Sequence, residues 1–226
     1  MGELLMNQNI RFTPLNLRTW KRGEIFYYFS NIAPTGYSLT VDLDITNMLG
    51  TLKNAGAKFF PAYLWLVTRT LNLQKEFKIA VKDGQPGYYD TLTPLYATFH
   101  HDTKTFSLMW TEYDNDFNVF CQAYSENQNR YGDNHGILSR KDRLPPENAY
   151  TVSCIPWISF QHFSVHSYEN KAYYFPSVEA GKFYQQGDRI LLPFSITCHH
   201  AATDGYHIDC FLNTLQSDAD TFGKFL

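Results

Sequence analysis

The stretch ILLPFSITCHHAATDGYH, residues 190–207, joins an apolar extended run to a polar turn and is the most informative part of the chain. Because side chains alternate along a strand, one face of this run would carry Ile190, Leu192, Phe194, Ile196 and Cys198. His200 continues that face where the strand ends, whereas His199 points to the opposite side. The Asp204-Gly205 pair predicts a sharp turn that can bring the Asp204 carboxylate back toward the strand end. The pattern indicates that His200 is half desolvated, in a position where a proton-transfer group can be oriented.

A metal site is an alternative interpretation of this stretch, whose possible ligands are His199, His200, Asp204, His207 and Asp209. Joint ligation by His200, Asp204 and His207 would need a continuous helix, and a glycine that follows a strand argues against one. A lone histidine at a strand end usually only makes hydrogen bonds. Two adjacent histidines with a carboxylate four residues further on weaken that structural interpretation. We therefore expect no metal here.

The rest of the chain alternates helical and extended patterns without a repeat or linker, so we expect one domain over residues 1–226. About residues 1–12 would form a flexible N-terminal extension. Helices are predicted at residues 18–30, 47–54, 62–73, around 117–131 and at 206–215. Strands are predicted at residues 37–45, 95–100, 106–113, 150–155, 158–166, 173–178 and 190–199. This order predicts an α/β (α+β) two-layer sandwich, with helices on one face of a mixed, mostly antiparallel sheet.

Composition excludes some classes of protein. With 19 Lys plus Arg against 22 Asp plus Glu, the net charge of -3 lacks the basic footprint of a nucleic-acid binder. Aromatic residues make up 17% of the chain, which fits a thick core or an oligomer interface at least as well as an apolar pocket. Four cysteines without a CxxC pair indicate free thiols in a reducing compartment. We find no signal peptide and no run of apolar residues long enough to span a membrane, so we expect a cytoplasmic protein.

A second candidate site is the segment SCIPW, residues 153–157. Ser153 would alternate away from its apolar neighbours near a strand end, where a hydroxyl can donate to an oxyanion without being a nucleophile. Alone, the segment would favour a serine that merely bonds to the backbone. Cys154 is a weaker nucleophile candidate because apolar neighbours should raise its pKa. There is no GxSxG elbow and no glycine-rich phosphate loop.

Seven segments together resemble the chloramphenicol acetyltransferase family from about residue 17 to residue 222. They are TWKRGEIF (19–26), KFFPAYLWLV (58–67), FHHDTKTFS (99–107), PEN (146–148), SCIPWISF (153–160), QQGDRILLP (185–193) and HHAATDGYH (199–207). The HHxxxDG pattern alone is shared with other coenzyme A-dependent acyltransferases and with peptide-synthetase condensation domains. Its combination with SxxPW and KFxP, in this order, is far more specific.

The resemblance implies a homotrimer of two-layer subunits with active sites at the subunit interfaces. It implies that His200 is the catalytic base, that Ser153 stabilises the oxyanion, and that Asp204 and Arg22 form a bracing ion pair. The acetyl group of acetyl-CoA would pass directly to an acceptor hydroxyl, without an acyl-enzyme. The residues implied for the coenzyme A channel are Lys58, Trp157, Lys182 and Phe183, the last at a usual tyrosine position.

The acceptor pocket departs from the family pattern. Residues implied to line it are Phe29, Phe106, Phe163, Val165 and Glu179. Glu179 stands where the family usually has threonine, and Ser177 replaces a usual large aliphatic residue. A carboxylate facing an apolar acceptor costs free energy unless it is paired or reaches water. The resemblance makes chloramphenicol the leading acceptor, and the departure at Glu179 makes a different hydroxyl or amine compound an alternative. A non-catalytic ligand-binding trimer is another, against which the intact set of site residues argues.

Overall fold

The computed structural model describes residues 10–165 and 173–226. Its strands are β1 (Phe12–Pro14), β2 (Gly36–Asp44), β3 (Ile79–Lys82), β4 (Gln85–Tyr89), β5 (Thr93–His100), β6 (Thr105–Trp110), β7 (Ala149–Cys154), β8 (Ser177–Ala180), β9 (Tyr184–Gln186) and β10 (Arg189–His199). Its α-helices are α1 (Gly23–Tyr27), α2 (Thr46–Ala55), α3 (Phe59–Asn72), α4 (Phe117–Tyr131) and α5 (Gly205–Asp220). Shorter helical turns are η1 (Tyr28–Ile32), η2 (Lys75–Lys78) and η3 (Phe222–Phe225).

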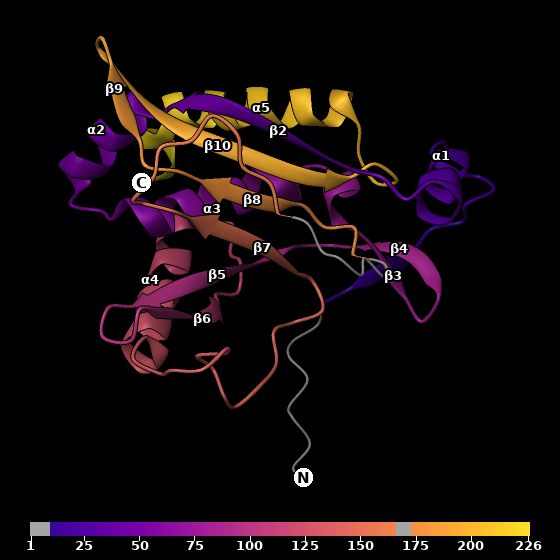
Figure 1. Ribbon diagram of the computed structural model, residues 1–226, viewed down its shortest axis with the longest axis horizontal. Helices are drawn as coiled ribbons and strands as arrows, with labels where there is room; N and C mark the ends of the chain where they lie inside the picture. The colour runs from indigo at the N-terminus through magenta and orange to yellow at the C-terminus, as the bar shows by residue number, and fades with distance from the viewer. Residues whose placement is uncertain (1–9, 166–172) are drawn as a thin grey trace.

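A seven-stranded sheet in the order β2-β10-β8-β7-β5-β6, with β9 paired to β10, runs through the described part of the chain (Figure 1). The β5–β7 and β7–β8 pairs are parallel. The remaining pairs of this sheet are antiparallel. The mixed, mostly antiparallel sheet is thus confirmed. A separate small sheet, β1-β4-β3, was not predicted from the sequence.

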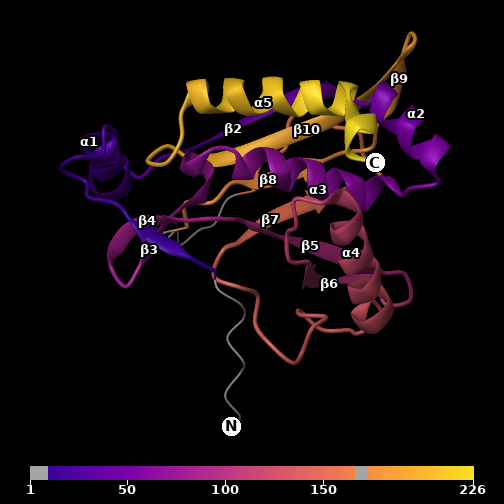
Figure 2. The same ribbon diagram turned by 180° about the vertical axis from the view of Figure 1, so that it is seen from behind.

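Helices α3 and α5 lie against one face of the sheet, and α4 packs beside α3 (Figure 2). The other face of the sheet is turned toward the viewer in Figure 1. The predicted two-layer arrangement is therefore confirmed. In α3, Pro61 sits in the first turn, where its missing N–H costs little, and the helix is buried on most sides as expected. Among the described residues, no helix has the length and apolar character needed to cross a bilayer.

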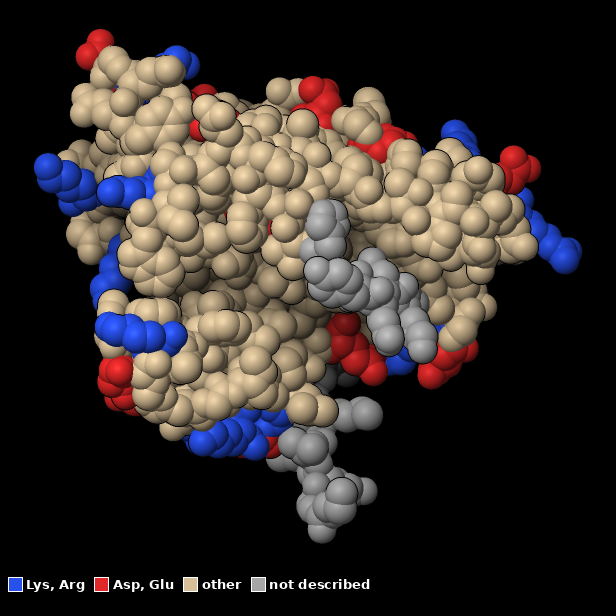
Figure 3. Space-filling view, viewed as in Figure 1, with Lys and Arg blue, Asp and Glu red and all other residues tan. Residues whose placement is uncertain are grey.

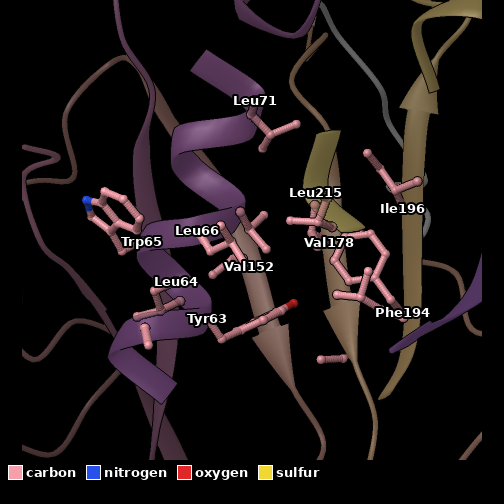
Figure 4. Close-up of a cluster of buried hydrophobic side chains, with 14 of the residues drawn as sticks. Tyr63, Leu64, Trp65, Leu66, Leu71, Val152, Val178, Phe194, Ile196 and Leu215 are labelled. Atoms are coloured by element: carbon pink, nitrogen blue, oxygen red, sulfur yellow. The ribbon is translucent and has the colours of Figure 1, made fainter. Parts of the chain in front are cut away.

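The core fills the space between α3 and strands β7, β8 and β10 (Figure 4). On β10, Leu192, Phe194 and Ile196 point into this core and are at most 1% exposed, as the alternation predicts. Burial of each such side chain stabilises the fold by roughly 1.5–3 kcal/mol relative to leaving it exposed. A slip of one residue would turn this apolar face outward, so burial fixes the register of β10 and the direction of the residues at its end.

The strand predicted at residues 158–166 is wrong for residues 158–165, and residue 166 lies outside the described residues. Both neighbours of β7 in the sheet are already occupied, by β5 and β8, so the segment that follows cannot add a strand there. Instead it is held at separate points. The backbone N–H of Lys182 donates to the carbonyl of Ile158 at 2.7 Å, and the Ser195 hydroxyl donates to the carbonyl of Phe163.

Two other predicted elements are displaced. The strand predicted at residues 173–178 begins only at Ser177. The helix predicted at residues 18–30 begins at Gly23 and continues as η1 to Ile32, because residues 17–22 form turns. The chain folds back tightly here: a Cβ on Gly23 would lie 1.8 Å from the carbonyl oxygen of Leu17. Of the extension expected at about residues 1–12, residues 1–9 lie outside the described residues, and Phe12 already belongs to β1.

Candidate active site

His200 follows the last residue of β10 and is held by contacts from several segments. Its backbone N–H donates to the carbonyl of Thr35 at 2.8 Å. Its ring packs against Phe29, with ring centroids 4.1 Å apart, and Tyr37 approaches it edge-on at 5.3 Å. The side chain is half-buried, as predicted for a residue at the margin of the core. The ring is thus oriented while part of it stays accessible.

The proton positions on the two adjacent histidines follow from their hydrogen-bond partners. Nδ1 of His200 lies 3.1 Å from the carbonyl oxygen of Thr203, which can only accept, so Nδ1 carries the hydrogen and Nε2 the lone pair. In His199 the assignment is reversed, because Nδ1 accepts the backbone N–H of Ala201 at 3.1 Å. Burial, together with the nearby His200, lowers the pKa of His199 and favours its neutral form. Of the two, His200 therefore has its lone pair on Nε2, the nitrogen farther from the backbone.

Asp204 is the N-cap of α5 and joins that helix to the segment before α1. Its carboxylate accepts the backbone N–H of Tyr206 at 3.1 Å and lies 2.9 Å from Nδ1 of His207. Its other oxygen forms an ion pair with Arg22. Partial burial acts to raise the pKa of Asp204, but the Arg22 hydrogen bond and the charges of His207 and Arg22 outweigh it and hold the pKa below its usual value. The structure thus brings Arg22 into contact with Asp204, which lies four residues after His200.

On the face of the sheet opposite α3 and α5, polar side chains form a row across four strands. Ser153 on β7 pairs with Glu179 on β8. Glu179 pairs in turn with Ser195 on β10, which pairs with Thr40 on β2. The Thr40 hydroxyl donates to the Ser195 hydroxyl at 3.0 Å. Ser153 is half-buried in this row, and its neighbour Val152 faces the core, as the alternation predicts.

Glu179 is a fully buried carboxyl in this row, directly beside Ser153. The Ser177 hydroxyl donates to its Oε1, and among the described residues its Oε2 has no hydrogen-bond partner. Burial raises the pKa of Glu179 to about 7, although the Ser177 hydrogen bond opposes this. A buried oxygen without a partner costs about 1–3 kcal/mol, so a donor brought by a ligand would be favoured at this position. Burial also raises the pKa of the Cys154 thiol to about 11, which argues against a nucleophile there.

The residues expected in the coenzyme A channel lie near one another where β7 and β8 end. Lys58 is the N-cap of α3, and the ring of the next residue, Phe59, lies 6.1 Å from that of Phe183. Trp157 is 60% exposed, and the residue after it accepts the backbone N–H of Lys182. All four expected residues are exposed to solvent: Lys58, Trp157, Lys182 and Phe183.

The residues expected in the acceptor pocket are divided between different parts of the chain. Phe29 contacts His200, at the end of β10. Phe163 lies on the segment after β7, where its carbonyl accepts the Ser195 hydroxyl of the polar row. Phe106 on β6 is 52% exposed and Val165 is 45% exposed. The structure therefore brings one of these side chains to His200, whereas the others and Glu179 lie on β6, on β8 and on the segment after β7.

His200 and Ser153 of one chain are far apart. The register of β7, β8 and β10 puts Ser153 opposite Ser195, two strand spacings or about 10 Å across the sheet. His200 lies a further five residues along the chain, just beyond the end of β10, or about 17 Å away. The separation of roughly 20 Å is too large for both side chains to contact one acyl group.

Sequence reasoning missed Tyr37 and Thr203, which orient His200. Thr203 lies inside the HHxxxDG pattern, but it acts through its backbone carbonyl, which its residue type does not reveal. Tyr37 was predicted only as the first residue of a strand. Its place beside His200 follows from its pairing with Cys198, a contact between distant parts of the chain.

A protein-family model described as "Chloramphenicol acetyltransferase" matches residues 10–216. The chain belongs to the chloramphenicol acetyltransferase family. A member from Staphylococcus aureus is 40% identical over 212 residues, covering 93% of this chain and 97% of the relative. A member from Vibrio anguillarum is 38% identical over 208 residues, covering 92% of this chain and 94% of the relative. The chain is therefore an acyltransferase, and the predicted family resemblance is confirmed.

Solved structures agree on the fold. A chloramphenicol acetyltransferase superposes with a TM-score of 0.83 at 23% sequence identity, covering 92% of this chain and 99% of the other. A probable dihydrolipoamide acetyltransferase from Listeria monocytogenes superposes with a TM-score of 0.61 at 14% identity, covering 96% of both chains. These likenesses confirm the fold of the chloramphenicol acetyltransferase family and of related acyltransferases.

Proposed function

We propose that the chain transfers the acetyl group of acetyl-CoA to a hydroxyl of chloramphenicol, with His200 as the general base. The observation that carries this proposal is the hydrogen bond from His200 Nδ1 to the Thr203 carbonyl, which leaves the basic lone pair on Nε2. A base positioned in this way contributes about 10²–10⁴-fold to the rate. Family membership supplies the reaction class.

The chemistry is a single addition and elimination at the thioester. Nε2 of His200 takes the proton of the acceptor hydroxyl as its oxygen attacks the thioester carbonyl carbon. The Ser153 hydroxyl donates to the oxyanion of the tetrahedral intermediate. The intermediate then collapses: the C–S bond breaks, the ester forms, and His200 returns the proton to the coenzyme A thiolate.

We assign this reaction to a homotrimer, with His200 and Ser153 of each site drawn from different subunits. Support comes from their separation of roughly 20 Å within one chain, which a single subunit cannot close. The face of the molecule seen in Figure 3 is mostly uncharged in its centre, with most charged side chains near the margin. Interface cores are depleted of charge in this way. Exposed apolar side chains on β6 and on the segment after β7 include Phe106, Trp157, Ile158 and Val165.

Coenzyme A would bind where β7 and β8 end. Lys58 and Lys182 are exposed cations suited to its phosphates, and Trp157 and Phe183 offer apolar surface to its pantetheine arm. The acceptor would lie between Phe29 of one subunit and the sheet face opposite α3 and α5 of another, with Phe106, Phe163, Val165 and Glu179 around it. No metal takes part in this scheme. We place the enzyme in the cytoplasm, where its free cysteines stay reduced, and expect it to confer chloramphenicol resistance.

Glu179 favours a second candidate within the same reaction class. Its buried Oε2 has no partner among the described residues, so an acceptor that brings a hydrogen-bond donor or a cation would gain there. Such an acceptor is another hydroxyl compound or an amine.

The test is acetyl-CoA turnover by purified protein, followed as release of the coenzyme A thiol. We expect release that depends on chloramphenicol and is lost in His200→Ala. Release with another hydroxyl or amine compound, but not with chloramphenicol, would favour the second candidate. Binding of acetyl-CoA without turnover of chloramphenicol or of any other hydroxyl or amine compound tested would contradict both candidates and favour a ligand-binding trimer.

A further inference from the structure

The hairpin formed by β5 and β6 holds a cluster of side chains that the reaction does not use. His100 is the last residue of β5, Asp102 follows it in the turn, and His135 comes from the segment after α4. Each offers one ligand atom, and these three atoms lie within 4.8 Å of one another. Among residues 10–165 and 173–226, no other group of three or more His, Cys, Asp or Glu side chains is arranged in this way.

His100 is oriented by a hydrogen-bond chain that settles its tautomer. Its Nε2 lies 2.8 Å from the Ser107 hydroxyl oxygen. That hydroxyl has a single hydrogen. Besides His100 Nε2, its partners among the described residues are the carbonyl oxygens of Asn134 and Gly136. Carbonyls only accept, so the Ser107 hydrogen goes to one of them, and Nε2 of His100 must donate. The lone pair of His100 is therefore on Nδ1. Metal-binding histidines commonly donate their other ring N–H to a fixed acceptor in this manner.

His135 and Asp102 complete the cluster from the solvent side. Nε2 of His135 lies 3.3 Å from the Asp102 carboxylate, and their side chains are 45% and 66% exposed. The His135 ring stacks on that of His100 with centroids 4.2 Å apart. One ligand is thus held rigidly inside, and two are free to adjust.

We propose that His100 Nδ1, His135 and Asp102 bind a divalent transition-metal ion such as Zn²⁺, at a site separate from the acyl-transfer residues. Two imidazoles and a carboxylate, with water in the fourth position, form a common tetrahedral zinc donor set. Bonds of about 2.0–2.2 Å require ligand atoms roughly 3.3 Å apart, so the cluster must contract. The stacked His135 ring must also turn until its lone pair converges with that of His100. Its half-exposed position allows this rotation.

The ion would join two segments that are already neighbours. The backbone N–H of Leu108 on β6 donates to the carbonyl of Ile137 at 2.7 Å, and the N–H of Ser139 donates to Leu108 at 3.0 Å. These bonds keep His135 next to the hairpin before any ion binds. A preformed arrangement lowers the entropy that binding must remove. Binding should therefore stabilise the hairpin and the segment at residues 132–139 together.

The experiment titrates full-length protein with ZnCl₂ against a chromophoric chelator. We expect one Zn²⁺ per chain, with affinity reduced about tenfold or more in His135→Ala and in Asp102→Asn. His101→Ala is the matched control, because His101 is exposed on the same turn but lies outside the cluster. It should bind Zn²⁺ as the wild type does.

Thermal unfolding supplies an independent reading. Zn²⁺ should raise the Tm of the wild type and of His101→Ala, and leave that of His135→Ala unchanged. Without Zn²⁺ the three proteins should unfold at similar temperatures, which shows that the substitutions leave the fold intact. Equal affinity of wild type and His135→Ala for Zn²⁺, or loss of binding in His101→Ala alone, would overturn the proposal. Acetyl-CoA turnover plays no part in this test, so its outcome is independent of the proposed reaction.

Discussion

The two ends of the central sheet are unlike. Where β10 ends, His200 is fixed by its own chain: Thr35 holds its backbone, Thr203 its Nδ1, and Phe29 its ring. Where β7 ends, Ser153 stands beside Glu179, a buried carboxyl whose Oε2 has no partner among the described residues. At the first end, His200 is oriented without a ligand. At the second, one oxygen of Glu179 lacks a hydrogen-bond partner among the described residues.

This difference suggests a division of labour between subunits. The end with His200 is preorganised, so it can present a base at low cost to whatever lies against it. The end with Ser153 carries the less satisfied polar groups and the expected coenzyme A residues, so its geometry depends on what binds. Each chain would then contribute two unlike half-sites, and variants at the two ends should behave differently.

The largest expected effect is at the preorganised end. His200→Ala should lower acetyl transfer by about 10²–10⁴-fold, because the general base is lost, with folding and assembly intact. His199→Ala should be milder, since its Nδ1 is engaged with the backbone N–H of Ala201. Steady-state turnover of both variants shows which histidine is the general base. If His199→Ala proves the more damaging, the assignment of the pair is wrong.

At the other end, Ser153→Ala should lower turnover by about 10²–10³-fold, the range for loss of one oxyanion donor, with acetyl-CoA affinity little changed. Unfolding and refolding the His200→Ala and Ser153→Ala proteins together should restore activity, because mixed trimers contain an interface with both intact groups. Each variant refolded alone is the control. Mixtures as inactive as the separate variants would mean that both residues act within one chain.

The ion pair between Arg22 and Asp204 should stabilise the His200 end. Removing one partner of a buried pair costs about 3–5 kcal/mol, and this pair is partly exposed, so we expect about 3 kcal/mol. Arg22→Ala and Asp204→Asn should therefore lower both thermal stability and turnover. Denaturant unfolding gives the free energy of unfolding directly. An inactive variant of unchanged stability would show instead a chemical role for that residue.

Glu179 should make stability depend on pH in a direction opposite to that of a paired carboxylate. Its pKa of about 7 in the folded chain exceeds the ordinary 4.5, so the folded state binds this proton more tightly than the unfolded state. Stability from this group is full below about pH 4.5 and is lost as the pH rises to about 7. The loss should be on the order of 3 kcal/mol. Glu179→Gln has no titrating proton at this position. Its free energy of unfolding, measured across this pH range, should therefore not show the loss.

The smallest effect concerns the acceptor. Glu179→Thr removes a buried carboxyl that disfavours a neutral apolar acceptor, so chloramphenicol turnover should improve about tenfold, mainly through KM. Kinetics with chloramphenicol as the varied substrate provide the measurement. Unchanged kinetics would mean that Glu179 does not contact the acceptor, and the structural contrast between the two ends would then not extend to substrate choice.

Much of this molecule could be predicted from local patterns. The alternation on β10, the buried α3 and the turn at Asp204-Gly205 depend on neighbours a few residues apart, which the sequence displays directly. The motifs HHxxxDG, SxxPW and KFxP, taken together and in this order, were specific enough to predict the family. The strand wrongly predicted at residues 158–165 shows why local patterns fail. The segment at residues 158–165 has a strand-like pattern, but whether it pairs depends on β5 and β8, which already occupy the edges of β7.

The sequence by itself determined the fold class and the family, because these follow from periodicity and from motif order, and it predicted the residue types of the reaction. Only the tertiary structure decided how those residues are arranged. The tautomer of His200 depends on a backbone carbonyl, the burial of Glu179 on three adjacent strands, and the neighbours of His100 on a segment more than thirty residues away. Such contacts join distant parts of the chain, and the pairing of strands that creates them is a property of the whole sheet.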